Sequence, residues 1–170
     1  MYFDAANKPM TATLQAIPDG KAGTVATLKI MRQITKAGKT SLPVRNLALS
    51  LVSELPQKDW FNELKILHKY VRDQIRYVKD IRGVETVQTP DVTLSLRAGD
   101  CDDKSVLLAA MLEAIGHPTR FIAIGFQPDD FVHVYPESRI GTSWVPLETT
   151  EPVEIGWTPK NVVSRLTIYN

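Results

Sequence analysis

The chain has 170 residues, 44% hydrophobic and 23% charged, a composition typical of a single globular domain. Its formal net charge of +1 gives no electrostatic reason to expect a nucleic acid or an anionic membrane as partner. A single cysteine excludes an internal disulfide and a cysteine-rich zinc site. No apolar run approaches the roughly 18 residues of a membrane span, so we expect no membrane insertion. The first residues lack a signal-peptide pattern, so we expect synthesis in the cytoplasm.

The first half of the chain is predicted to be mostly helical. Prolines and a "PDG" turn indicate an extended arm or short hairpin over residues 1–21. Apolar residues then recur about once per helical turn, which predicts helices from Thr24 to Gly38 and over residues 42–54 and 58–78.

The second half changes from helix to strand. Residues 79–98 contain turn-forming glycine and proline and are expected to be irregular, and a helix is predicted over 101–115. Short apolar runs separated by turns predict strands at 119–126, 131–136, 143–148 and 163–169. Because helices come first and strands later, we expect an α+β fold with an antiparallel sheet.

The stretch "RAGDCDDKS" places Cys101 where the predicted helix begins. The unpaired N–H groups and the dipole of a helix start lower the pKa of a cysteine there. Asp100, Asp102 and Asp103 oppose ionisation of the thiol, so a catalytic role would need an imidazolium nearby. The alternative is a small buried cysteine without a chemical role.

Three histidines could supply that imidazolium. His117 follows the predicted helix and lies more than ~20 Å from Cys101 if the helix is straight, so it is a poor partner. His68 is interpreted as a packing or surface histidine. His133 lies in the apolar strand "FVHVYP", which could pack on the helix that carries Cys101. Glu148, in the next strand, could face His133 and orient its ring; otherwise it is an ordinary strand-end carboxylate.

Together these residues resemble the transglutaminase-like superfamily of papain-like cysteine enzymes. The similarity is carried by "GDC" before "LLAAMLEAIG", then "TRFIAIGF", "VHV" and "WVPLE", and upstream by "IRYVKD" and "TPDVTLSLRAGDC". The similarity spans about residues 60–150. It implies a papain-like, transglutaminase-like core over residues 58–170. An N-terminal arm and helical extension over residues 1–57 would precede this core, and the two parts would form one compact unit.

The resemblance also implies roles for individual residues. Cys101 would be the nucleophile and His133 the general base and acid. Glu148 stands where the family usually has aspartate, which keeps an acceptor but adds a methylene. The backbone N–H of Cys101 could bind the oxyanion. For a second donor we favour Gln88 over Tyr77 and Trp60, which core packing would also explain.

The resulting functional expectation is cysteine-dependent acyl transfer through a thioester. Water as acceptor would make the protein a peptidase or amidase acting on a peptide, protein or peptidoglycan-like amide, and an amine would make it a transglutaminase. Neither a cofactor nor a metal is expected, because no calcium-loop pattern is present.

The alternative is a structural or assembly protein that uses this fold with little or no activity. The whole chain is similar to small transglutaminase-like proteins of Mu-like phages and prophages. That similarity implies phage structural proteins as partners, in tail or head assembly, and a place in the virion.

Overall fold

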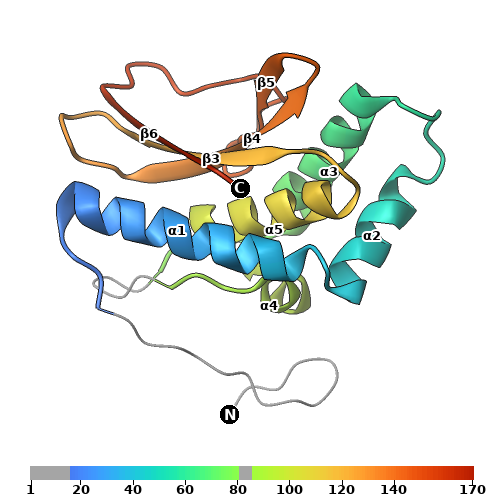
Figure 1. Ribbon diagram of the computed structural model, residues 1–170, viewed down its shortest axis with the longest axis horizontal. Helices are drawn as coiled ribbons and strands as arrows, with labels where there is room; N and C mark the ends of the chain where they lie inside the picture. The colour runs from blue at the N-terminus through green and yellow to red at the C-terminus, as the bar shows by residue number, and fades with distance from the viewer. Residues whose placement is uncertain (1–15, 81–85) are drawn as a thin grey trace, which may run out of the picture.

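The computed structural model describes residues 16–80 and 86–170, which form a layer of helices against one four-stranded sheet (Figure 1). The sheet lies above α1 and α5 in this view, and the remaining helices gather around α5. The helices are α1 Gly20–Gly38, α2 Leu42–Val52, α3 Trp60–Gln74, α4 Pro90–Leu96 and α5 Cys101–Ala114. The arm predicted over residues 1–21 falls mostly outside the described residues.

The main sheet is antiparallel, as expected. Its strands are β3 Thr119–Gly125, β4 His133–Ile140, β5 Ser143–Pro146 and β6 Ser164–Tyr169, in the order β5-β4-β3-β6. The register pairs Ile124 with His133, so His133 lies at the end of the sheet where β3 finishes and β4 begins. The α+β class predicted from the sequence is confirmed.

Helix α5 is the centre of the molecule. All residues from 102 to 112 are buried, so the helix has no polar side facing solvent. One side of α5 packs in a core cluster with α2 and α3, through residues such as Val44 and Leu67. Its other side joins a cluster with α1 and the sheet, which contains Met31 and Phe121. A helix buried on all sides holds its first residue, Cys101, in a fixed place.

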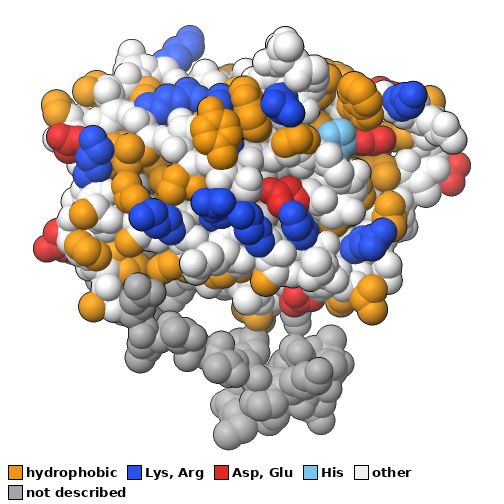
Figure 2. All heavy atoms as spheres, viewed as in Figure 1, with side chains coloured by type: hydrophobic (Ala, Val, Ile, Leu, Met, Phe, Trp, Pro, Cys, Tyr) orange, Lys and Arg blue, Asp and Glu red, His pale blue; other side chains and the backbone are white. Residues whose placement is uncertain are grey.

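Helix α1 turns one side to this core and the other to solvent. Leu28 and Met31 are buried, whereas Lys29, Arg32 and Lys36 are exposed at helical spacing. Figure 2 shows the resulting row of basic side chains along the helix. The two N-terminal helices therefore share their core with α5, and the expected boundary between residues 57 and 58 stays a prediction.

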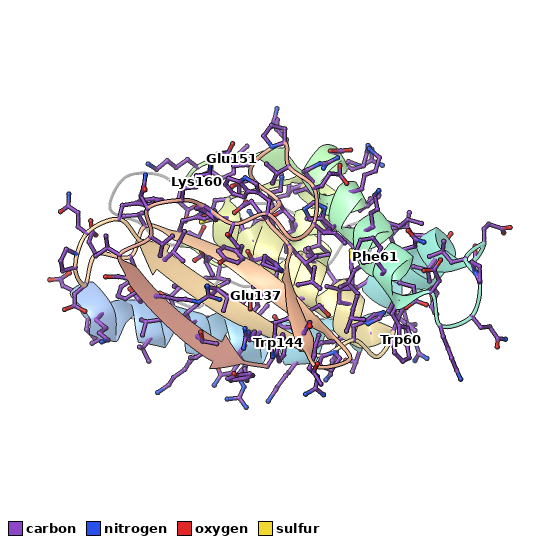
Figure 3. The ribbon with its side chains drawn as sticks, turned by 90° about the horizontal axis from the view of Figure 1, so that it is seen from above. Trp60, Phe61, Glu137, Trp144, Glu151 and Lys160 are labelled. Carbon is purple, nitrogen blue, oxygen red and sulfur yellow. The ribbon has the colours of Figure 1, made fainter. Side chains whose placement is uncertain are left out.

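The outer side of the sheet carries a small polar and aromatic cluster. Glu137 is buried and accepts from Arg120 at 2.7 Å and from Arg165 at 2.8 Å. The guanidinium of Arg120 also lies 4.2 Å from the centre of the Trp144 ring. Figure 3 shows Glu137 and Trp144 on this side. The salt bridges and ring stacking tie β3, β4, β5 and β6 together.

Two predicted segments were wrong in part. The helix expected over 58–78 ends at Gln74, and Arg76–Tyr77 form strand β1, which pairs in parallel with β2 Ala98–Gly99. Helix α4 begins at Pro90, within the stretch expected to be irregular. Short segments of this kind lack a full period of apolar residues, so tertiary contacts decide them. In the described part of the chain, no helix combines the length and the apolar character required to cross a membrane.

Candidate active site

Cys101 is the first residue of α5, and the preceding residues fix the start of that helix. Asp100 is the N-cap: its carboxylate accepts from the backbone N–H groups of Asp102, at 3.0 Å, and Asp103, at 3.2 Å. Asp103 returns the interaction by accepting from the backbone of Asp100, which completes a capping box. A side chain at Gly99 would put its Cβ 2.5 Å from the Cβ of Asp103, so only glycine fits there.

The acidic residues before and after the cysteine therefore have separate structural roles. Asp103 is buried and also accepts from the backbone N–H of Gln88 at 2.7 Å, which holds the segment before α4 against the start of α5. Burial raises the pKa of Asp103 to about 7, an effect that these hydrogen bonds oppose. The hydrogen bonds of Asp100 and Asp103 thus go to the backbone and fix the start of α5.

The thiol itself lies in a setting that favours its neutral form. Burial raises the pKa of Cys101, and the charges of Asp102 and Asp100 raise it further. The thiol lies 3.5 Å from Oδ1 of Asp102, and the backbone N–H of Val134 donates to the sulfur and partly offsets these effects. Because Val134 follows His133 directly, this contact brings the start of β4 to the sulfur.

His133 and Glu148 contact each other as expected, although Glu148 follows β5 and is not part of the strand predicted over 143–148. Nε2 of His133 lies 2.6 Å from Oε2 of Glu148, whose side chain is fully buried. The other carboxylate oxygen accepts from both the backbone N–H and the hydroxyl of Thr150, each at 2.7 Å. Burial opposes ionisation of Glu148, but the bonds from His133 and Thr150 outweigh it and lower the pKa of the carboxyl. Glu148 is therefore a carboxylate that orients the imidazole.

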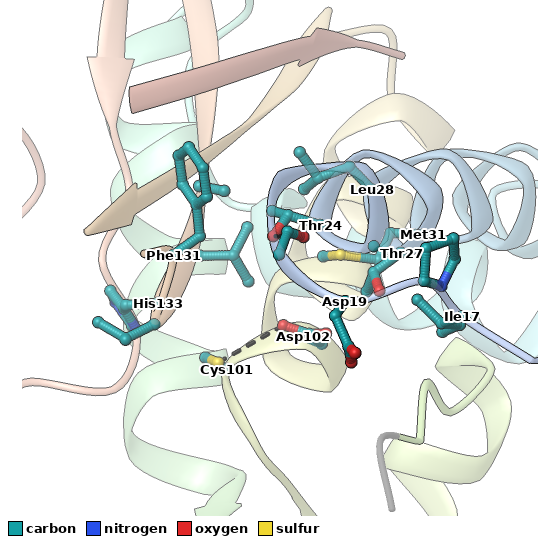
Figure 4. Close-up of a pocket in the computed structure, with 16 residues that line it drawn as sticks. Ile17, Asp19, Thr24, Thr27, Leu28, Met31, Cys101, Asp102, Phe131 and His133 are labelled. Carbon is teal, nitrogen blue, oxygen red and sulfur yellow. Dashed lines mark hydrogen bonds between the residues drawn. The ribbon is translucent and has the colours of Figure 1, made fainter. Parts of the chain in front are cut away.

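Cys101 and His133 line the same cavity, of about 490 Å³ (Figure 4). Its opposite wall is the first half of α1, including Thr24 and Thr27, and Phe131 closes one side. Asp19 and Asp102 are the two carboxylates that line it. A hollow beside a cysteine and an imidazole provides space for the group that would react with the sulfur.

The other two histidines are both buried, and they lie in different parts of the chain: His68 is part of α3, and His117 contacts α3. His117 lies beyond the far end of α5, where Nε2 is 2.5 Å from Oε2 of Glu63. His68 contacts the backbone oxygen of Glu148 through Nε2. Periodicity predicted only that His68 adjoins an apolar stripe. Nothing in the sequence linked it to a residue 80 positions away.

The side chains considered as oxyanion donors lie in different places. Gln88 does not line the cavity, and its side-chain oxygen accepts from Thr93 at 3.5 Å. Trp60 is half exposed at the start of α3, on the outside of the molecule (Figure 3). Tyr77 is also half exposed. Burial is the main cause that raises the pKa of its hydroxyl, and electrostatic interaction with Cys101 is the second. Tyr77 does not line the cavity either.

One group of side chains could offer three metal ligands. In the described residues, ligand atoms of Asp100, Cys101 and Asp102 lie within 4.8 Å of one another. The carboxylate of Asp100 already caps α5, so this arrangement is accounted for by the helix start.

Comparison with known proteins agrees with this geometry. A model of the transglutaminase-like superfamily matches residues 47–149, which include Cys101, His133 and Glu148. The chain belongs to the transglutaminase-like superfamily. The match begins within α2, earlier than the resemblance at residues 60–150 had indicated. A search of curated proteins finds no match.

Solved structures share the transglutaminase-like fold. One is a candidate cysteine protease from Cytophaga hutchinsonii, with a TM-score of 0.53, 19% identity, and coverage of 75% of this chain and 46% of the other. Another is a candidate protease from Parabacteroides distasonis, with a TM-score of 0.61, 15% identity, and coverage of 85% and 32%. This chain therefore spans less than half the length of either structure.

Proposed function

We propose that the protein is a cysteine-dependent acyl transferase that cleaves amide or peptide bonds through a thioester. The observation that carries this proposal is the cavity shared by Cys101, at a helix start, and His133, held by the buried carboxylate of Glu148. A nucleophile, a general base and a carboxylate that orients the base are the three parts of a catalytic triad for such chemistry.

The hydrogen bond to Glu148 determines which nitrogen of His133 can act as base. A carboxylate only accepts, so Nε2 carries a proton and Nδ1 of the neutral ring is left to accept one. The raised pKa of Cys101 makes the resting group a thiol. The thiol would therefore give its proton to Nδ1 while the sulfur attacks the carbonyl carbon. The carbon–nitrogen bond then breaks, and His133 passes the proton to the departing amine.

The thioester would then be resolved by water or by an amine. With water, His133 takes a proton from the water, a carboxylic acid forms, and the thiol is regenerated. We favour hydrolysis of a peptide, protein or peptidoglycan-like amide. The cavity between α1 and β4 is the proposed site for the acyl group.

For the oxyanion we propose the backbone N–H of Cys101 and a second donor from a side chain. Gln88, Tyr77 and Trp60 were considered from the sequence, and none of them lines the cavity. Gln88 remains the donor that the sequence favours.

Reaction with p-nitrophenyl acetate tests the proposal without knowledge of the natural substrate. The sulfur would displace p-nitrophenolate and form an acetyl thioester, seen as a burst of absorbance and an acetyl adduct on Cys101 by mass spectrometry. Cys101→Ala and His133→Ala should abolish the burst, and His117→Ala should keep it. Adding glycine ethyl ester then shows whether the acetyl group passes to an amine or only to water.

No burst from the folded parent protein would instead favour a structural or assembly role. The implied association with phage proteins or a virion stays a prediction from resemblance.

A further inference from the structure

Two side chains of α3 hold the segment that follows β5. His68 contacts the backbone oxygen of Glu148. One turn further along α3, the guanidinium of Arg72 donates to the backbone oxygen of Val153 at 2.6 Å and to Glu154 at 3.2 Å. The segment that carries Glu148 is thus attached to a helix at two points.

Glu148 is consequently held by a histidine on each side. His133 bonds to its carboxylate and His68 to its main chain. His68 is only 1% exposed and does not line the cavity beside Cys101. A role in direct contact with substrate in that cavity is therefore excluded. Within the described part of the chain, the hydrogen-bond partner of His68 is Glu148, the residue that holds His133.

The protonation of His68 follows from its partner. A carbonyl oxygen only accepts, so Nε2 of His68 must carry the proton and donate. Burial lowers the pKa of His68, with the charge of Arg72 acting in the same direction, against the bond to Glu148 and the charges of Glu154 and Glu148. His68 is therefore a neutral donor at pH 7, and it adds no charge that would compete with His133 for the carboxylate.

We propose that His68 is a positioning residue of the active site, which fixes Glu148 so that its carboxylate orients His133. This inference rests on the proposed function, because it assigns His68 a part in the reaction of Cys101. The physical basis is that a supporting hydrogen bond limits the drift of a catalytic group, and small displacements of such groups are costly.

The variant His68→Phe removes the donor and keeps an aromatic ring of similar size, whereas His68→Gln keeps a donor. We expect His68→Phe to slow acetylation of Cys101 by p-nitrophenyl acetate about tenfold, a typical cost of losing a supporting partner. His68→Gln should recover most of the rate. The matched control is His117→Phe, which alters another buried histidine, one that contacts α3 from beyond the end of α5.

A second arm separates positioning from general damage to the fold. If His68 acts through Glu148, then His68→Phe should have no further effect in a Glu148→Gln background. In the parent background it should also move the pH profile of acetylation toward the higher pH range of a thiol that reacts without a base. Equal slowing in both backgrounds, or by His117→Phe, would overturn the inference.

A spectroscopic arm tests the inference even if the parent does not react. The proton shared by Nε2 of His133 and Glu148 should give a low-field NMR signal that shifts or broadens in His68→Phe and not in His117→Phe. If the parent reacts but His68→Phe changes neither the NMR signal nor the rate, the role of His68 is contradicted and the proposed function still stands. An unreactive parent contradicts the proposed function and leaves the NMR comparison to decide on His68.

Discussion

At the scale of single residues, opposing influences act on the thiol of Cys101. Burial disfavours the thiolate most, and the charges of Asp102, 3.5 Å away, and Asp100 add to this effect, whereas the N–H of Val134 favours the thiolate. In the proposed mechanism the nucleophile would therefore stay protonated until a base acts. A cysteine that is ionised at rest would not need this step, so the proposed reaction would depend on His133.

Replacing Asp102 by Asn should therefore make Cys101 more reactive at neutral pH in the absence of substrate. The loss of one nearby charge is expected to lower the thiol pKa by about one unit, or about tenfold in the thiolate fraction. The rate of Cys101 alkylation by iodoacetamide between pH 6 and 9 measures this change in the thiolate fraction. Asp129→Asn, which changes an exposed carboxylate in the β3–β4 turn, should leave the rate as in the parent. A slower rate in Asp102→Asn would mean that the carboxylate assists the thiol.

Glu148 can be tested by changing its charge and its length separately. Glu148→Gln leaves a side chain of the same shape that no longer stabilises an imidazolium and can present its NH₂ group to the ring. We expect acetylation by p-nitrophenyl acetate to fall by more than about 100-fold, since loss of the orienting carboxylate costs about 10⁴ in the serine-protease triad. Glu148→Asp should be milder, as aspartate is usual in the family. If Glu148→Gln reacts like the parent, Glu148 has no part in the reaction.

At the scale of elements, α1 forms a wall of the cavity beside Cys101 although it precedes the region matched by the family model. The sequence predicted this helix from its apolar period but gave no sign of its contact with Cys101. Such a contact depends on how α1 packs across α5, which a single-helix pattern does not encode. The same reason explains why α4 and β1 were missed, while the start of α5 at Cys101 was predicted correctly.

Filling the cavity from α1 should therefore change which acyl groups react. Thr27→Trp would place an indole beside Cys101, whereas Lys29→Trp would place one on the exposed side of the same helix. We expect Thr27→Trp to slow reaction with p-nitrophenyl phenylacetate at least about tenfold more than reaction with the acetate ester, as steric selection in a pocket does. Equal slowing of both esters, or of both variants, would show that the cavity does not receive the acyl group.

At the scale of the whole molecule, a buried lysine links the site's helices to stability. Lys104, on α5, is 2% exposed and donates to the backbone oxygen of Ile75 at 2.8 Å, which caps the end of α3. Burial lowers its pKa from 10.5 to about 8, against the charge of Glu148, which favours protonation. Holding this charge inside the core therefore carries a cost in the folded state.

That cost predicts a specific pH dependence of stability. Between about pH 8 and 10.5 the unfolded chain retains a proton that the folded protein has released, so this group makes the free energy of unfolding rise with pH. The rise should amount to about 3 kcal/mol at most. Urea unfolding from pH 7 to 10.5 measures this effect: the free energy of unfolding should rise more steeply with pH in the parent than in Lys104→Met. Lys69→Met, on the exposed side of α3, should match the parent slope.

The extent of sequence-based prediction differs between these scales. Cys101, His133 and Glu148 could be named because their residue types follow a recognisable order along the chain. The contact between His133 and Glu148 could be anticipated because adjacent strands bring positions 15 apart together. The parts contributed by α1, His68 and Lys104 could not, because each depends on packing between elements distant in sequence.

The long separation between His68 and Glu148 also has a consequence for how the protein folds. Closing a loop of 80 residues carries an entropic cost. The contacts that offset this cost form only after β5 and α3 have both packed around α5. Local helices, by contrast, form within microseconds. During dilution from denaturant, the helical circular dichroism signal should therefore recover first, and the burst with p-nitrophenyl acetate should return only with the last kinetic phase. The reactivity of one sulfur atom would then report when the chain has completed its topology.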